Sequence, residues 1–434
     1  MFTPGRYVVV DDDEKELGLL VDALQSSGVP CLGVRYTDED GVKASFLRGS
    51  RVLFLDLHLT TGAPASDIAV PASIITAILE EAIEEGAAPY IVVLWTKHTD
   101  QKDAFEDYLF ENLAPGKRPI KVVGLDKNHF LAANSGPKLL ETVTDAISVD
   151  PRLNVLLQWE REVLSAASRT VGSVVRMVPD LKRTEADFSG DLDRVLSVLA
   201  REALGATHAA ADPRTALNSA LTPILSDRLA NMEIGAAEIE VWKSGITRIS
   251  EEGLGAENDA AQLNAMLHIA LPQSEHMTPG GLGVVTLVSS EAADAEAMIG
   301  EMFGLKANSH LSNLFQIRER ADRRRSRLCL LRIGAACDFA QARKGPMPFV
   351  LGAVIPVDIE RTDRPLAEFE TPPFILPDFD GPVRMAWNVR MTATRTEAQI
   401  ETWAPSWRLR EQLLAQVVMQ GAGYATRPGI VSFD

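Results

Sequence analysis

The amino-acid sequence predicts a multidomain α/β protein whose first domain is a doubly wound, five-stranded parallel sheet. Three observations carry this prediction. The chain of 434 residues is too long for a single hydrophobic core. Apolar segments typical of strands alternate with segments of helical periodicity up to about residue 147. A long stretch without strand signals follows, and such signals return only near residue 328.

The elements of the first domain follow one another in strand–helix order. Strands are predicted at residues 7–10, 30–36, 51–55, 90–95 and 119–125, and helices near 17–24, 41–47, 71–85, 100–112 and 139–147. Gly28 ends the first helix. Residues 51–55, Arg-Val-Leu-Phe-Leu, are a nearly continuous apolar run, which is typical of a strand buried on both faces. The functional crevice of such a sheet lies beyond the carboxyl ends of its strands.

The rest of the chain divides into two further domains. Residues 151–289 are rich in Ala, Leu, Glu and Arg and predict a helical connector or bundle, with loop chemistry at residues 278–283. Residues 290–434 predict an α+β domain that acts as an effector or docking domain. Its strands are expected at 328–333, 349–356 and 383–392, and a helix at 407–419. With the first domain at residues 1–150, this gives three domains.

Composition narrows the class of protein. The net charge of −17 argues against a chain whose main task is to grip nucleic-acid phosphates. Cys31, Cys329 and Cys337 are too few for a disulfide framework or a cysteine zinc site, which favours a reducing location. No signal-peptide pattern is present, and no window reaches the roughly 18 apolar residues that a spanning helix needs. We expect a cytoplasmic, soluble protein that has no membrane partner.

Polar side chains follow the predicted strands at the points where those strands end. Asp11 and Asp12 follow the first strand, Asp56 the third, Thr96 the fourth and Lys127 the fifth. Because the carboxyl ends of parallel strands meet at one edge, we expect these side chains to converge. Clustered carboxylates repel one another unless a divalent cation lies among them, and Mg²⁺ prefers oxygen ligands. A hydroxyl and an ammonium can then hold phosphoryl oxygens, so the pattern predicts phosphoryl transfer to a carboxylate.

These residues resemble the site of bacterial response-regulator receiver domains, the phosphoacceptor modules of two-component signalling. Val-Val-Val-Asp-Asp matches the family's acidic pair at Asp11 and Asp12, and Leu-Phe-Leu-Asp matches its phosphoacceptor at Asp56. Thr96 matches the switch Ser/Thr, and Lys127 matches the lysine that contacts the phosphoryl group. The resemblance covers about one third of the chain. It implies a receiver fold and a Mg²⁺ held by the two acids and the phosphoacceptor.

The segment after the phosphoacceptor departs from the family. The resemblance implies that the third metal contact is the backbone carbonyl of His58. Residues 57–62, Leu-His-Leu-Thr-Thr-Gly, however, replace the family's usual loop. The stretch from Asp56 to Thr96 is longer than is typical, and Asn128 follows the lysine instead of a proline. The metal and phosphoacceptor carboxylates are all present, which favours a working site over a degenerate one.

Each of these residues also has a simpler interpretation. An Asp at a strand–helix junction can cap the helix, and this is the favoured role of Asp13. Thr96 can form a local turn through its hydroxyl, and Lys127 can be an ordinary solvated lysine. His58, His98 and His129 fall near the crevice, but their spacing matches no metal-ligand motif.

Two features lie outside the first domain. The basic run at residues 318–327 contains Glu319 and Asp322, which favours a solvated helical face or a site for an acidic partner over nucleic-acid binding. Cys337 is followed by Asp338, but no base is identifiable for it, so a buried structural thiol is favoured.

The resemblance implies a response regulator that a histidine-kinase-like partner phosphorylates on Asp56, with output through a protein partner or through buffering of phosphoryl groups. Two alternatives stay open. One is a pseudo-receiver that serves as a docking surface without phosphotransfer. The other is an enzyme within residues 290–434 that the receiver gates. A homodimer is also left open.

Overall fold

The computed structural model describes residues 6–26, 28–60, 68–130, 141–142, 145, 151–178, 188–249, 258–272, 277–304, 306–335, 339, 345–361 and 367–426. The chain divides into two compact units. One comprises residues 1–164 and 232–249, and the other comprises residues 165–231 and 250–434. Within the described residues, no helix is both long enough and apolar enough to cross a membrane.

The described part of the first unit is built on a five-stranded sheet in which all neighbouring strands are parallel. The strand order is β2-β1-β3-β4-β5, with β1 (Tyr7–Asp11), β2 (Cys31–Arg35), β3 (Val52–Leu55), β4 (Ile91–Thr96) and β5 (Lys121–Asp126). β3 and β4 are buried along their whole length, as their apolar sequences predict. The chain changes direction across the sheet between β1 and β3, and this is where parallel sheets form a crevice.

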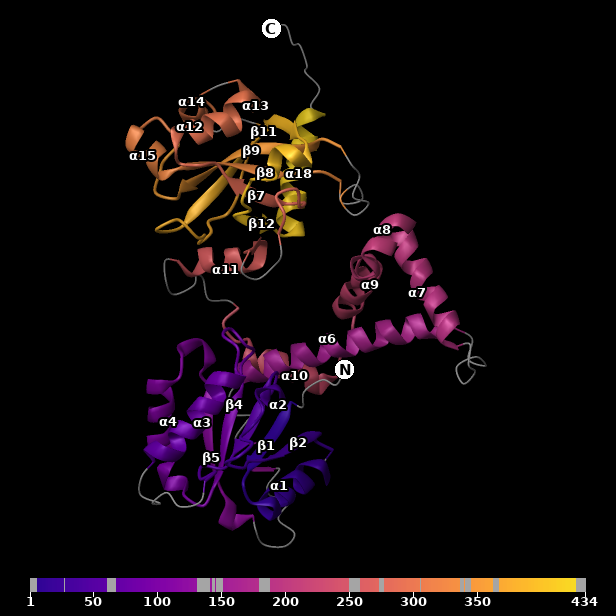
Figure 1. Cartoon of the computed structure of the whole chain (residues 1–434), viewed down its shortest axis with the longest axis vertical. Helices are drawn as coiled ribbons and strands as arrows, with labels where there is room; N and C mark the ends of the chain where they lie inside the picture. Colours follow the sequence, from indigo (N-terminus) through magenta and orange to yellow (C-terminus); the bar gives the residue numbers. More distant parts are fainter. Residues whose placement is uncertain are drawn as a thin grey trace. The chain divides into compact units, whose positions relative to one another are not determined.

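Helices cover both faces of this sheet (Figure 1). Helices α3 (Ala69–Ala82) and α4 (Lys102–Asn112) share a core with Leu53 and Leu55 of β3. Helix α1 (Glu14–Ser26) and the start of α6 (Pro151–Arg176) share a second core with Phe54 of the same strand. This division follows from the alternation of side chains along a strand. Gly28 has a φ of 79°, a left-handed conformation suited to the chain reversal after α1.

Short segments complete the first unit: α2 (Ala44–Leu47), η1 (Thr99–Gln101), η2 (Pro115–Lys117), η3 (Lys127–His129) and α10 (Ala236–Gly245). Two polar contacts fix the first turns of α6. Arg51 of the sheet donates to Glu160 from Nη2 at 2.9 Å and from Nε at 3.1 Å, and Trp242 of α10 donates to Glu162 at 3.0 Å.

The segment that was predicted to be helical contains helices joined by short connections, and no strand, in its described part up to residue 268. After α6 come α7 (Phe188–Leu204), α8 (Ala206–Ala211), α9 (Pro213–Ala230), α10 and α11 (Asp259–His268). Helices α7, α8 and α9 share a small core of Ala and Leu side chains. Asp212 begins α9 by accepting a hydrogen bond from the Thr215 N–H at 3.0 Å.

The described residues of the second unit also form a seven-stranded sheet in which the paired strands are antiparallel. Its order is β10-β11-β9-β8-β7-β12-β6, with β6 (Ile269–Ala270), β7 (Val284–Leu287), β8 (Arg327–Arg332), β9 (Met347–Pro356), β10 (Glu368–Glu370), β11 (Val383–Arg395) and β12 (Trp407–Leu409). Leu331 and Val350 face a core shared with Leu413 and Val417 of α18 (Glu411–Ala425).

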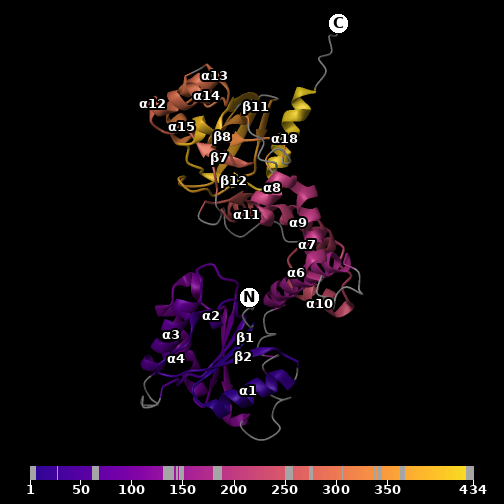
Figure 2. The same cartoon turned by 45° about the vertical axis from the view of Figure 1, so that its right-hand side comes forward.

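The opposite face of this sheet carries a second core, and Figure 2 shows α18 on one side of the sheet and the cluster of short helices on the other. These short helices are α12 (Ala292–Ala295), the π-helical turn η5 (Glu296–Gly300), α13 (Glu301–Phe303), α14 (Ala307–Asn313) and α15 (Arg320–Arg325). The capped turn α17 (Glu397–Ile400) follows β11. The basic run at residues 318–327 therefore leads through α15 into β8.

The structure differs from the sequence-based prediction in one helix of this unit. Residues 407–409 were predicted to begin a helix, but they form β12, and the helix begins at Glu411. The backbone of these residues pairs with β6 and β7, which are distant in sequence, and buried side chains alternate along it. β7 also pairs with β8, so the sheet draws on residues before 290. The helix expected near residues 139–147 lies mostly outside the described residues, and Cys337 and Asp338 lie wholly outside them.

Candidate functional site

The carboxyl ends of the parallel strands open into one cavity of about 330 Å³. It is lined by Asp12, Asp13, Glu16, Asp56, His58, Thr60, Thr96, Lys97, His98 and Lys127. Asp11 lies directly against this lining, fully buried, and contacts Lys127. All the residues that the sequence analysis assigned to the site are therefore brought together.

Asp11, Asp12 and Asp56 form the acidic centre of the site. Each offers one oxygen, and these oxygens lie within 4.8 Å of one another, close enough to hold a metal ion. The arrangement follows from strand register, because Val10 pairs with Leu55 and the next residue of each strand is an Asp. Burial raises the pKa of Asp11 to about 6, although Lys127 acts in the opposite direction. Burial, followed by the charge of Asp56, also raises the pKa of Asp12.

Lys127 is the buried cation of the site, with only 1% of its side chain exposed. Its ammonium lies 2.7 Å from Asp11 Oδ2, 2.8 Å from Glu16 Oε2 and 2.9 Å from Asp56 Oδ2. Burial acts to lower the pKa of Lys127, but the charges of Asp56 and Asp11 outweigh it and raise the pKa. Two of its three N–H donors make the hydrogen bonds to Asp11 and Glu16, and Asp56 is a further ion partner. The alternative of a solvated lysine does not fit this burial.

Glu16 lines the cavity and pairs with Lys127, but the sequence did not lead us to predict it as a site residue. It lies in the first turn of α1, which Asp13 caps by accepting hydrogen bonds from the N–H groups of Lys15 at 2.8 Å and Glu16 at 3.2 Å. These bonds lower the pKa of Asp13 and confirm its predicted capping role. The sequence does contain a signal for Glu16, because the Asp-x-x-Glu spacing from Asp13 resembles a capping box. In the structure the Glu16 carboxylate instead pairs with Lys127 and Lys97.

Thr96 is fully buried at the end of β4 and lines the cavity. Its hydroxyl oxygen accepts a hydrogen bond from the His98 N–H at 3.1 Å, the local turn that was considered as its simpler role. The hydroxyl proton stays available to a second partner, because a hydroxyl both accepts and donates. Both roles are therefore compatible with this geometry.

Of the three histidines considered for the site, His58 and His98 lie at the cavity and His129 does not line it. The rings of His58 and His98 meet edge to face, with centroids 5.1 Å apart, at the wall of the cavity. The His58 N–H donates to Asp56 Oδ1 at 3.3 Å. His129 is largely exposed, with Asp126 at 3.9 Å. Among the residues that the structure describes, no histidine belongs to a group of three potential metal ligands.

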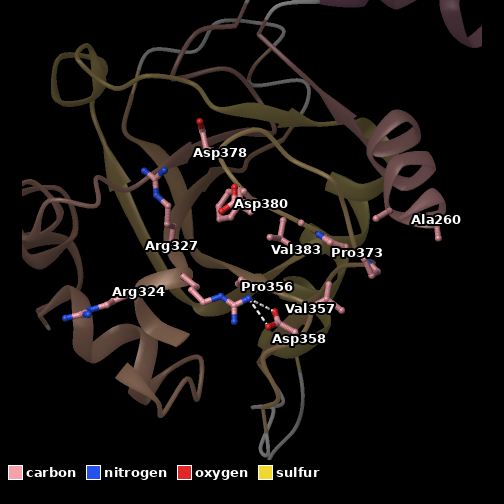
Figure 3. Close-up of a pocket in the computed structure, with 15 residues that line it drawn as sticks. Ala260, Arg324, Arg327, Pro356, Val357, Asp358, Pro373, Asp378, Asp380 and Val383 are labelled. Carbon is pink, nitrogen blue, oxygen red and sulfur yellow. Dashed lines mark hydrogen bonds and ion pairs between the residues drawn. The ribbon is translucent and has the colours of Figure 1, made fainter. Parts of the chain in front are cut away.

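A second hollow, of about 760 Å³, lies in the other unit (Figure 3). It is bordered by the end of α15, the start of β8, the end of β9 and the loop before β11. Arg325 pairs with Asp358 at 2.8 Å, and Arg327 donates to the Val288 carbonyl at 3.0 Å. Asp378 and Asp380 lie near Arg327 on the facing loop. The lining thus combines both charges with apolar side chains.

Comparisons of the chain with known protein families, with curated proteins and with solved structures found no match. The class of the protein is therefore described from its fold and its site alone. The chain is a multidomain α/β protein whose first unit carries, at the carboxyl edge of a parallel sheet, an acidic cluster that could hold a metal ion. This arrangement is compatible with a receiver-like fold.

Proposed function

We propose that the first unit is a receiver-type phosphoacceptor and that the chain acts in signal transduction as a response regulator does. One observation carries the proposal. The buried Lys127 ammonium lies 2.9 Å from Asp56 in the cavity that Asp12 and Thr96 also line. A carboxylate nucleophile, a cation for the phosphoryl oxygens and a hydroxyl donor are the groups that phosphoryl transfer to an aspartate uses.

Asp56 is the nucleophile of the proposed reaction. One of its carboxylate oxygens attacks the phosphorus of a phosphohistidine on a histidine-kinase-like partner. The O–P bond forms as the P–N bond breaks, and the departing imidazole nitrogen takes up a proton. Lys127 neutralises charge on the phosphoryl oxygens, and the Thr96 hydroxyl donates a hydrogen bond to one of them.

The donor set of the site fits Mg²⁺. Asp11, Asp12 and Asp56 would hold it through oxygen atoms, which are the ligands that this hard cation prefers. By the resemblance to receiver domains, the backbone carbonyl of His58 would be a further oxygen ligand. A bound Mg²⁺ supplies positive charge that neutralises the phosphoryl oxygens during transfer. The three acids outnumber the single ammonium among them, so a further cation is electrostatically favoured.

Intact-mass measurement after incubation with Mg²⁺ and acetyl phosphate tests the proposal. We expect the gain of one phosphoryl group, with acetate as the leaving group, and its loss in Asp56→Asn. Asp107→Asn is the matched control, because this exposed aspartate on α4 lies outside the cavity and should leave the gain intact. Absence of both phosphorylation and Mg²⁺ binding would instead favour a pseudo-receiver that acts as a docking surface.

The proposed output is a change of surface near β4 and β5. A phosphoryl group that draws Thr96 toward Asp56 would favour one of two arrangements of this region, which a protein partner could read. The alternative output is storage of phosphoryl groups, which would buffer a pathway. This role needs the same site but no protein partner that recognises the changed surface.

The second hollow favours one further candidate, in which the second unit binds a small polar ligand and the receiver gates that activity. Its volume is within the range of small-molecule sites, and polar groups of both charges line it. Thermal-shift screening of small polar molecules on the full chain tests this candidate. A ligand that stabilises the wild type but not Arg327→Gln would support it, whereas no shift across the screen would favour a protein output.

A further inference from the structure

We propose that Glu16 couples the phosphoacceptor site to the segment after Thr96, because it pairs with both Lys127 and Lys97. We call this chain of three charged side chains, Lys127–Glu16–Lys97, the latch. Glu16 Oε2 accepts from Lys127 at 2.8 Å, while Glu16 Oε1 accepts from Lys97. This inference deepens the proposed phosphotransfer to Asp56 and rests on it.

The contacts of Lys127 explain why Glu16 is the partner that yields. The ammonium donates hydrogen bonds to Asp11 and Glu16, and Asp56 is its third ion partner at 2.9 Å. A phosphoryl group on Asp56 adds negatively charged oxygens that attract the ammonium, so that one of the two hydrogen bonds must lengthen or break. Asp11 is fully buried and also accepts from the Asp13 N–H at 2.9 Å, so it is held in place. Glu16 lies nearer the surface, with 14% of its side chain exposed.

Release of Glu16 from Lys127 also affects Lys97, the other end of the latch. Lys97 directly follows Thr96, the last residue of β4, and begins the connection through η1 to α4. In the unphosphorylated state, Glu16 connects this segment to the first turn of α1. When the phosphoryl group replaces Glu16 at Lys127, Glu16 and Lys97 lose the buried anchor that holds them. The state of Asp56 thereby reaches residues 97–101 through side chains alone.

Hydrogen exchange on the full, unphosphorylated chain tests the latch without phosphotransfer. Glu16→Gln removes the charge and keeps the shape, and we expect exchange of the backbone amides at residues 97–101 to rise about tenfold, the size of a hydrogen bond to a charged group. Glu14→Gln is the matched control, because Glu14 is in the same helical turn but faces Arg35 at 3.4 Å. Equal exchange in Glu16→Gln and wild type would overturn the inference, whatever the fate of the phosphotransfer.

Binding of beryllofluoride, a mimic of the phosphoryl group, in the presence of Mg²⁺ gives the second test. We expect Glu16→Gln to bind it about tenfold more tightly, since the competing acceptor loses its charge. Glu14→Gln should bind like the wild type, and an equal rise in both variants would show a general charge effect and overturn the latch.

A double-mutant cycle with Lys97→Met completes the test. The effect of Lys97→Met on beryllofluoride affinity should be smaller in the Glu16→Gln background than in the wild type, because Lys97 acts through Glu16. Strict additivity would overturn the coupling. A wild-type chain that binds no beryllofluoride would count against the proposed function, and the exchange experiment would then still decide the latch.

Discussion

Each unit buries a cation against carboxylates, and the two sites differ in their balance of charge. Lys127 lies among Asp11, Asp56 and Glu16, and Asp12 joins the same cluster. In the other unit Arg361, also 1% exposed, lies 2.7 Å from Glu368 and pairs with Glu370.

Arg384 adds a second cation to this other site, at 3.7 Å from Glu370. Two arginines thus face two glutamates, and the charges balance. At the Lys127 site the acids are in excess and border a cavity. Buried ion pairs of similar chemistry therefore suit different tasks: balanced pairs fix a structure, whereas an excess of acids at a cavity attracts another cation.

The largest expected effects come from removing each buried cation. Lys127→Met and Arg361→Met should each destabilise their unit by about 3–5 kcal/mol, because each leaves buried carboxylates without their counter-charge. Mg²⁺ should restore part of the lost stability in Lys127→Met, since it can balance the cluster, and none in Arg361→Met. Denaturant unfolding with and without Mg²⁺ measures both effects.

Lys102→Met is the control for these two variants, because Lys102 pairs with Glu106 at the surface and its loss should cost less than about 1 kcal/mol. An equal response of both buried-cation variants to Mg²⁺ would remove the distinction between the two sites.

The comparison also explains how much the sequence could predict. In a parallel sheet the carboxyl ends of all strands meet at one edge, so the positions of Asp56, Thr96 and Lys127 after their strands were enough to place them together. Glu16 was missed because it reaches the site from a helix whose first turn is set by the Asp13 cap. Strand ends alone contain no such information.

The antiparallel sheet offered no comparable rule. Its strands end alternately at both edges, and its partners are set by contacts between distant segments. Residues 407–409 were predicted as the start of a helix, but pairing with β6 and β7 holds them extended. The Arg361 network likewise joins a loop to β10 and β11, and local sequence patterns do not predict such contacts.

Glycines in the two sheets should differ in their tolerance of a side chain. A Cβ on Gly352 of β9 would lie 2.3 Å from the ring of Trp387, its fully buried partner on β11. A Cβ on Gly33 of β2 would meet the flexible Val21 side chain at 2.9 Å and Leu17 at 3.5 Å. We expect Gly352→Ala to destabilise its unit by about 1–3 kcal/mol through overpacking, and Gly33→Ala to cost less. Thermal unfolding of both variants measures the difference, and equal losses would contradict it.

The affinity of the acidic cluster for Mg²⁺ should depend on pH in a definite direction. Burial raises the pKa of Asp11 to about 6, so this carboxyl holds a proton below that pH and must release it to bind a metal. Affinity should therefore be level above pH 7 and fall by up to about tenfold per unit below pH 6. Calorimetric titration at pH 7.5 and pH 5 checks this expectation, and equal affinities would show that Asp11 is not a ligand.

The smallest expected effect separates the helix caps of the two units. Asp13→Ala removes the acceptor of two N–H groups at the start of the thirteen-residue α1, which should cost about 1 kcal/mol. Thr396→Ala removes the cap of α17, a helix of four residues, and should cost less because little helix depends on it.

Asp13→Asn keeps a capping oxygen without its charge, so it should retain most of the stability that Asp13→Ala loses. It should also leave Glu16 in place beside Lys127, since the cap sets the first turn of α1. Denaturant unfolding ranks the three variants. If Asp13→Asn is as unstable as Asp13→Ala, the charge of Asp13 contributes more to stability than its capping hydrogen bonds do. The cap would then not explain the position of Glu16.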